Sequence, residues 1–270
     1  MKKASAFFLS FALMLLFSFP VFASDNVVAE PEYIAPLENT NTLSESELND
    51  YLGQMGFTTE ETSFISLALK KQIVSDGGIK IKAEKLNPVK TIIDEEGKVV
   101  SSNQFSTRSV QEGNFSLYGF ATKNSSPNSS ENSYNIYAQY NWAKAPTFCF
   151  TDTLGMAWQS QATPYGAPYS VHNWRSDPQL FQYTNKTQKQ ENDGDAVEIN
   201  IISTGDQSQD GYLKQEIRVA KSYAGQTGSV ALGYAHKLIP GAALAILNFF
   251  SVDFSGAAIE DFTDRFNFTY

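Results

Sequence analysis

The chain has 270 residues, and its 29 acidic residues outnumber its 20 basic ones, which gives a formal net charge of −9 at pH 7. An acidic chain lacks the clustered Lys and Arg side chains that neutralise a phosphate backbone, so nucleic acid is not an expected partner. The single cysteine, Cys149, excludes a disulfide within the chain. Stability must therefore come from the hydrophobic core.

The first 23 residues have the pattern of a secretory signal peptide. Lys2 and Lys3 precede an apolar run over residues 4–19, Pro20 interrupts that run, and Ala23 ends a candidate cleavage site. The apolar run is short for a membrane span, and we expect no transmembrane anchor. The pattern predicts a protein secreted to the extracellular space. Secretion without disulfides favours a Gram-positive type of bacterium as the source.

Two capping boxes predict helices near the N-terminus. Ser44 precedes Glu47 and Thr58 precedes Glu61, each at the spacing at which the two side chains satisfy free amides of a first helical turn. Apolar residues follow each box at helical spacing, and Gly56 separates the two predicted helices. The predicted organisation is a signal peptide (1–23), a linker (24–42), a helical hairpin (43–78), a β-hairpin with a further linker (79–113) and a β-sandwich domain (114–270).

The region from 114 to 270 has short strand-like segments separated by loops rich in Gly, Asn, Asp, Ser and Pro. The clearest alternation of side chains lies at 134–142, and Pro146 separates it from a second run at 147–158 that we expect to be its antiparallel hairpin partner. Such a series predicts a mainly β fold, an antiparallel β-sandwich of jelly-roll-like type. An elongated, aerolysin-like β protein is the alternative. The candidate strands are 115–122, 134–142, 147–158, 169–174, 180–184, 197–204, 212–222, 229–238, 243–254 and 259–268.

Two segments carry a family resemblance. Residues 47–73, ELNDYLGQMGFTTEETSFISLALKKQI, resemble the N-terminal helical segment of uncharacterised secreted proteins of Gram-positive bacteria. Residues 140–160, YNWAKAPTFCFTDTLGMAWQS, are similar to the central strands of some of those proteins. The resemblance implies secretion and brings no catalytic motif.

No catalytic residue is predicted. Cys149 lies close to Asp152 in sequence, and the two histidines are His172 and His236, but the aromatic neighbours of Cys149 favour a buried strand position. The chain has neither a G-x-S-x-G nor an H-E-x-x-H motif. Glu198 and Glu216, on strands expected to be adjacent, are one candidate carboxylate pair for glycoside hydrolysis, although acids on a β surface are usually solvated.

An acidic loop at 191–195 offers a possible calcium site. Asp193 and Asp195 flank Gly194 and supply the hard oxygen ligands that calcium prefers. The loop does not match the EF-hand pattern, and an ordinary hairpin turn around Asp193-Gly194 is the alternative. Apart from possible calcium, no cofactor is expected.

Four aromatic residues form the predicted ligand-binding patch: Tyr137, Trp142, His172 and Trp174. Aromatic rings with a polar handle are common at binding surfaces, whereas burial in the core is the alternative for each of them. Carbohydrate of the cell envelope, or another surface component, is the expected partner. The leading hypothesis is a secreted, non-enzymatic binding or interaction protein.

Two further functions stay open. Residues 229–256 contain few charges, and strands on either side of Pro240-Gly241 could form a membrane-inserting β-hairpin, as in a β-type toxin. The alternative for this segment is two buried sandwich strands. The other hypothesis is an envelope hydrolase with an N-terminal pro-segment.

Overall fold

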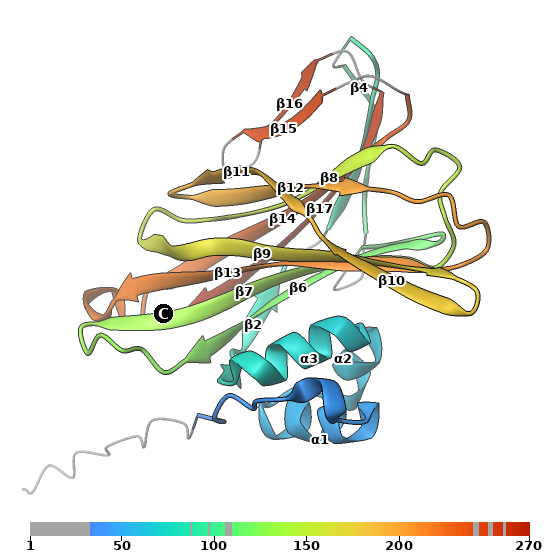
Figure 1. Cartoon of the computed structure of the whole chain (residues 1–270). Helices are drawn as coiled ribbons and strands as arrows, with labels where there is room; N and C mark the ends of the chain where they lie inside the picture. Colours follow the sequence, from blue (N-terminus) through green and yellow to red (C-terminus); the bar gives the residue numbers. More distant parts are fainter. Residues whose placement is uncertain are drawn as a thin grey trace, which may run out of the picture. The chain divides into compact units, whose positions relative to one another are not determined.

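Two antiparallel β-sheets face each other across a common core, which confirms the predicted β-sandwich class (Figure 1). The computed structural model describes residues 33–270 except 87, 97, 106–109, 240–242, 248–250 and 256–257, and no side chains at 110–112, 189, 243–247 and 251–255. The expected signal peptide lies outside the described residues, as do residues 24–32 of the expected linker.

The first sheet, here called the β13 sheet, has seven strands. Their order is β1 (Ile79–Lys80), β6 (Phe115–Asn124), β7 (Glu131–Trp142), β13 (Gln209–Ala220), β9 (Ala162–Ser176) and β10 (Gln179–Thr184), with β5 (Val110–Glu112) also paired to β6.

The second sheet, here called the β14 sheet, has eight strands. Their order is β11 (Lys186–Glu191), β12 (Gly194–Asn200), β8 (Thr151–Trp158), β14 (Thr227–Lys237), β17 (Ile259–Thr269), β3 (Val89–Ile93) and β4 (Val99–Gln104), with β2 (Ala83–Lys85) also paired to β17.

The core is built from alternate residues of strands in both sheets. Tyr134 and Tyr140 of β7 point inward from one sheet, while Trp158 of β8 and Tyr234 of β14 do so from the other. Burying such large rings dominates the hydrophobic stabilisation of a sandwich. The alternation detected in the sequence at 134–142 is therefore the core pattern.

The predicted hairpin of 134–142 with 147–158 is wrong. The two segments become β7 and β8, which lie in different sheets, and β7 pairs with β6 and β13 instead. The chain crosses from one sheet to the other between Trp142 and Thr151. Two strands that face each other across a core show the same buried alternation as two strands side by side, so the pattern alone does not separate these cases.

Helices cover the face of the β13 sheet that points away from the core. They are α1 (Glu45–Gln54), α2 (Thr59–Phe64) and α3 (Leu67–Asp76), with short 3₁₀ turns η1 (Thr40–Thr42) and η2 (Lys221–Tyr223) elsewhere. Leu69 and Ile73 of α3 belong to one apolar cluster with Phe120, Tyr137 and Tyr212 of the sheet. This docking supplies the burial that such short helices need.

Both predicted capping boxes form, but the second predicted helix is two helices. The side chains of Ser44 and Thr58 each accept a hydrogen bond from the backbone amide three residues later. The glutamate at that later position accepts one in return from the backbone amide of the capping residue. Ile65 is extended and ends α2, after which Ser66 caps α3. Gly77 ends α3 with a φ of 67°, where an added Cβ would collide with the backbone around Ala35.

The division at residues 113/114 does not separate two structural units. The predicted hairpin within 79–113 forms as β3 and β4, but β3 pairs with β17, and β1 pairs with β6. Residues 32–270 form one compact unit. Strand β11 was not predicted, and the single strand expected at 243–254 is instead a separate two-stranded sheet of β15 (Ala243–Leu247) and β16 (Ser251–Ser255).

Candidate functional site

A cleft of about 680 Å³ lies between helices α2 and α3 and strands β9, β10 and β13. Its rim carries large apolar side chains that are unusually exposed. Tyr169 is 42% exposed and Leu180 is 60% exposed, and Phe64 and Leu67 of the helices are exposed as well. A concave surface with exposed aromatic and aliphatic groups is typical of ligand-binding sites.

The floor of the cleft is a row of polar side chains across three strands. The register pairs Asp210 of β13 with Asn173 of β9, and Asn173 with Gln182 of β10. Asn173 Nδ2 donates to Asp210 Oδ1 at 3.0 Å, and Gln182 Nε2 donates to Asn173 Oδ1 at 2.7 Å. Burial raises the pKa of Asp210, against the opposing effect of hydrogen bonds from Asn173 and Ser66. The row presents fixed donors and acceptors beneath an apolar rim.

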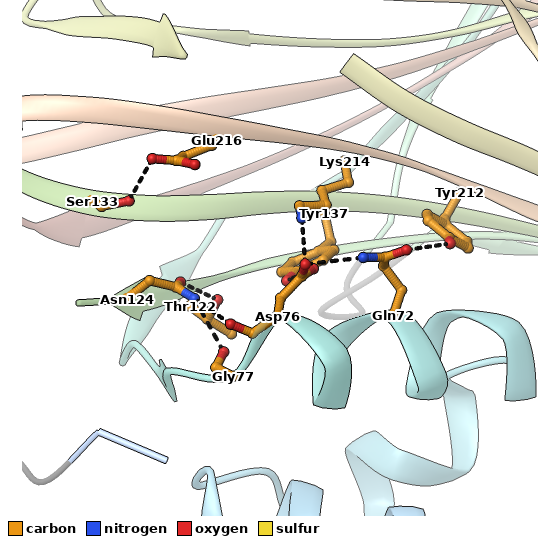
Figure 2. Close-up of polar contacts among 10 residues, drawn as sticks. All are labelled: Gln72, Asp76, Gly77, Thr122, Asn124, Ser133, Tyr137, Tyr212, Lys214 and Glu216. Atoms are coloured by element: carbon orange, nitrogen blue, oxygen red, sulfur yellow. Dashed lines mark hydrogen bonds and ion pairs between the residues drawn. The ribbon is translucent and has the colours of Figure 1, made fainter. Parts of the chain in front are cut away.

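The helical wall of the cleft is tied to the sheet by a polar junction. Figure 2 shows Gln72 and Asp76 of α3 directed at Tyr137, Lys214 and Tyr212 of the sheet. Tyr137 Oη donates to Asp76 Oδ2 at 2.8 Å, and Lys214 Nζ lies 2.5 Å from Asp76 Oδ1. An acid at the last position of a helix is disfavoured by the helix dipole, and these two contacts offset that cost. Burial and the nearby Asp76 hold the pKa of Tyr137 well above its usual range, so the phenol keeps its proton.

A glutamine from the sheet explains why α2 and α3 are separate. Gln139 Nε2 donates to the carbonyl of Phe64 at 2.6 Å, and Gln139 Oε1 accepts from the amide of Ser66 at 2.7 Å. Both backbone groups would need helical partners if the helix continued. One buried amide therefore satisfies the break and fixes the position of Phe64 at the mouth of the cleft.

The predicted aromatic patch does not form one solvated surface. Tyr137 and Trp142 are 0% and 6% exposed, and they lie on opposite faces of β7. The expectation that they face solvent is wrong, because the helices cover one face of the sheet and the second sheet covers the other. His172 is also buried, and burial lowers its pKa to about 4. Trp174 is half-buried, stacks on His172 with ring centroids 5.8 Å apart, and contributes to the cleft lining.

Four cleft residues were not singled out from the sequence: Tyr169, Asn173, Gln182 and Asp210. Asp210 is the second residue of β13. Tyr169 and Asn173 share one face of a strand, which period-two alternation could have revealed. Their meeting with Gln182 and Asp210 depends on strand order, which alternation does not report.

The catalytic candidates are dispersed or buried. Asp152 and His236 do meet, with Asp152 Oδ2 2.8 Å from His236 Nδ1, but they are 0% and 2% exposed. Cys149 Sγ donates to the carbonyl of Pro146 at 3.3 Å. Glu198 lies in the β14 sheet and Glu216 in the β13 sheet, so the expectation that they sit on adjacent strands is wrong.

The two acids of the predicted calcium loop lie in the β11–β12 hairpin. Asp193 is in the turn, where its carbonyl accepts from the Trp158 amide at 2.9 Å, and Asp195 is buried in β12. Among the described residues, no three or more His, Cys, Asp and Glu side chains are grouped so that they could hold a metal ion. The calcium site stays a prediction.

Comparisons with known proteins give a fold likeness at low similarity. No family model and no curated protein matches the chain. Among solved structures, Clostridium perfringens delta-toxin is 10% identical with a TM-score of 0.35 (70% of this chain, 96% of that chain). The Clostridium perfringens NetB toxin in its membrane-inserted form is 6% identical with a TM-score of 0.31 (70% and 97%).

ACE19, the collagen-binding subdomain of the Enterococcus faecalis surface protein ACE, is 8% identical with a TM-score of 0.30 (57% of this chain and 96% of that chain). No argument about the function of this chain rests on likeness at this level. In the part of the chain that the structure describes, no helix combines the length and apolar character needed to cross a membrane.

Proposed function

We propose that this chain is a secreted, non-enzymatic binding protein of the extracellular space or cell envelope, and that the cleft beside α3 holds envelope carbohydrate. The observation that carries the proposal is the arrangement of the cleft, with Tyr169 and Leu180 exposed above the polar row of Gln182, Asn173 and Asp210.

The cleft matches the chemistry of a sugar. A sugar ring has apolar C–H faces that pack on aromatic rings, and hydroxyls that both donate and accept hydrogen bonds. Side-chain amides both donate and accept hydrogen bonds, and a carboxylate accepts them through two oxygens. The charged lining residues are Lys71, Arg175 and Asp210, which form no cluster of one sign. A neutral ligand therefore fits better than a polyanion.

Two substitutions test this proposal. Tyr169→Ala removes an exposed ring from the rim, and Asp210→Asn removes the carboxylate while keeping the side-chain shape. Each is expected to weaken binding to envelope polysaccharide about ten-fold, which corresponds to about 1.4 kcal/mol of binding free energy. Pull-downs on isolated cell walls and glycan arrays find the ligand, and isothermal titration calorimetry gives the dissociation constant.

Phe148→Ala is the matched control, because Phe148 is an exposed aromatic residue outside the cleft lining. It should bind like the wild type. The proposal is wrong if no glycan binds, or if both cleft variants bind as tightly as the Phe148 control.

A second candidate function, insertion into membranes, is favoured by the position of the β15–β16 hairpin. This hairpin forms its own sheet between β14 and β17 in the chain, and β15 lies against β8 and β11 (Figure 1). The predicted pairing around Pro240-Gly241 is wrong, because β14 belongs to the sandwich and β15 pairs with β16.

Small residues line the outer face of the β14 sheet where β12, β8 and β14 lie side by side. Its cross-strand rows place Ala157 beside Ala231, and Gly155 between Ala196 and Gly233. The three alanines are buried although they lie on the face away from the core. Such small residues allow the backbone of a covering segment to come close, but their side chains interlock little with it. A covering segment could therefore detach with little disturbance of side-chain packing.

The composition of the hairpin suits a membrane-spanning ribbon. The 21 residues from 238 to 258 include one charged residue, Asp253. The register pairs Leu244 with Phe254 and Ile246 with Val252, so these four apolar positions share one face of the ribbon. A transmembrane strand needs about 9–11 residues, so this segment is long enough for two strands and a turn.

Leakage from liposomes tests the second candidate. Wild-type protein is expected to release dye, and Val252→Asp is expected to abolish release because a charge on the lipid-facing side is costly. Val100→Asp, at an exposed position on edge strand β4, is the control and should leak normally. Absence of leakage across neutral, anionic and sterol-containing vesicles, or full leakage by Val252→Asp, would remove this function.

A further inference from the structure

A second cleft of about 740 Å³ lies on the same face of the β13 sheet, at the C-terminal end of α3. Ser75 lines both clefts, so they adjoin at the C-terminal part of α3. The register aligns Tyr169 of the first cleft with Lys214, and Tyr165 of the second cleft with Glu216. Lys214 and Glu216 both line the second cleft. The same strand, β9, therefore supplies an exposed tyrosine to each cleft.

The ring of Tyr165 is fixed by neighbouring side chains but stays accessible to solvent. The Arg218 guanidinium carbon lies 3.2 Å from the centroid of the ring, and Arg218 Nε is 3.1 Å from Glu216 Oε1. Ser133 Oγ donates to the same Glu216 oxygen at 3.0 Å, as Figure 2 shows. Although these contacts fix the ring's surroundings, Tyr165 remains 53% exposed. A fixed, exposed ring is a low-entropy platform for a ligand.

The charges of the second cleft are already paired within the protein. Lys214 pairs with Asp76, and Arg218 pairs with Glu216. All four side chains are partly buried, so each pair holds its geometry and leaves little net charge for a ligand. This pairing disfavours a polyanion, as does the chain's net charge of −9. The side chains of Asn124 and Asn135 add neutral amides to the lining.

From these features we infer that the ligand is an extended, neutral polysaccharide that occupies both clefts, with Tyr169 and Tyr165 as successive platforms. Positions 165 and 174 are nine residues apart on β9, a span of at most about 30 Å at the rise of an extended strand. That length accommodates several sugar units. This inference rests on the proposed carbohydrate function and adds chain length as a determinant of affinity.

A ladder of neutral oligosaccharides tests the inference. The probes are glucose and N-acetylglucosamine oligomers from disaccharide to octasaccharide, titrated into the full mature protein. Wild-type affinity is expected to rise with chain length. Tyr165→Ala should weaken the longest oligomers about ten-fold and leave the shortest that bind unchanged, whereas Tyr169→Ala should weaken all of them. Tyr165→Phe should retain the affinity for long oligomers, because it keeps the ring.

The outcomes separate this inference from the function on which it rests. If short and long oligomers bind equally well and Tyr165→Ala is silent, the extended groove is wrong while carbohydrate binding stands. If no oligomer binds although wall polysaccharide does, the neutral-polymer inference is wrong. If no carbohydrate binds at all, the proposed function itself fails. Thermal unfolding of each variant checks that the loss of binding is not a loss of folding.

Discussion

Replacing Asp152 by alanine is expected to lower the free energy of unfolding by about 3–5 kcal/mol, the usual cost of breaking a buried charged network. Asp152 is fully buried and accepts hydrogen bonds from three groups. Tyr234 Oη donates at 2.7 Å, the amide of Lys237 donates at 3.1 Å, and His236 Nδ1 lies at 2.8 Å. Alanine would leave these groups without their acceptor and open a cavity in the core. Urea unfolding followed by tryptophan fluorescence measures the change.

The effect should spread into the core, because Tyr234 is itself an acceptor. Trp142 Nε1 donates to Tyr234 Oη at 2.9 Å, so the network joins the β13 sheet to the β14 sheet. Burial raises the pKa of Asp152, against the opposing hydrogen bond and charge of His236. Asp152→Asn keeps one carbonyl acceptor and should lose less stability than Asp152→Ala.

Asp206→Ala is the control for the loss of an acidic side chain, since Asp206 is exposed and pairs with Lys144 in an exposed salt bridge. Its unfolding midpoint should match that of the wild type. If Asp152→Ala unfolds at the same urea concentration as this control, the network does not stabilise the sandwich.

Local signals in the sequence predicted local structure well. The capping boxes at Ser44 and Thr58 depend on residues three positions away, and both form as predicted. The break between α2 and α3 depends on Gln139, which lies 73 residues from Ser66 in the chain. No residue close to Ile65 in the sequence indicates the contact with Gln139, so the helical periodicity predicts one continuous helix across Ile65.

The alternation of side chains along the chain predicts which segments form strands. It does not predict to which sheet each strand belongs. Residues 134–142 and 151–158 alternate alike because both bury one face in the same core, although they lie in opposite sheets. The same limit applies to the site. The strand face that carries Tyr137 also carries Asn135, Gln139 and Asn141, a polar pattern that indicates solvent, whereas helices cover part of that face. Trp174 alone of the four predicted ligand-binding residues lines the cleft.

Replacing Asp195 by asparagine is expected to raise the free energy of unfolding at pH 8 by up to about 4 kcal/mol. Asp195 is 2% exposed, and neither carboxylate oxygen has a hydrogen-bond partner among the described residues. Burial raises its pKa from 3.8 to about 7. Asparagine keeps the shape of the side chain and carries no charge at any pH.

The direction of the pH dependence follows from the raised pKa. Well below pH 3.8 the Asp195 carboxyl is protonated in both the folded and the unfolded chain, so its ionisation does not change the free energy of unfolding. Between about pH 4 and 7 the unfolded chain ionises while the folded chain holds its proton, so stability falls as pH rises. Above pH 7 the loss is complete. Wild-type stability should therefore decline from pH 4 to pH 7 relative to Asp195→Asn, with the two converging at low pH.

Calcium distinguishes an unpaired buried acid from the predicted metal site. If Asp195 is an unpaired buried acid that binds no metal, calcium should leave the unfolding midpoint of the wild type at pH 8 unchanged. With a calcium site at Asp193 and Asp195, calcium should stabilise the wild type, and both Asp195→Asn and Asp193→Asn should remove that effect. Asp193→Asn otherwise serves as the control, because this turn residue should not reproduce the gain of Asp195→Asn. If Asp195→Asn is no more stable than wild type at pH 8 without calcium, burial does not penalise the Asp195 carboxylate.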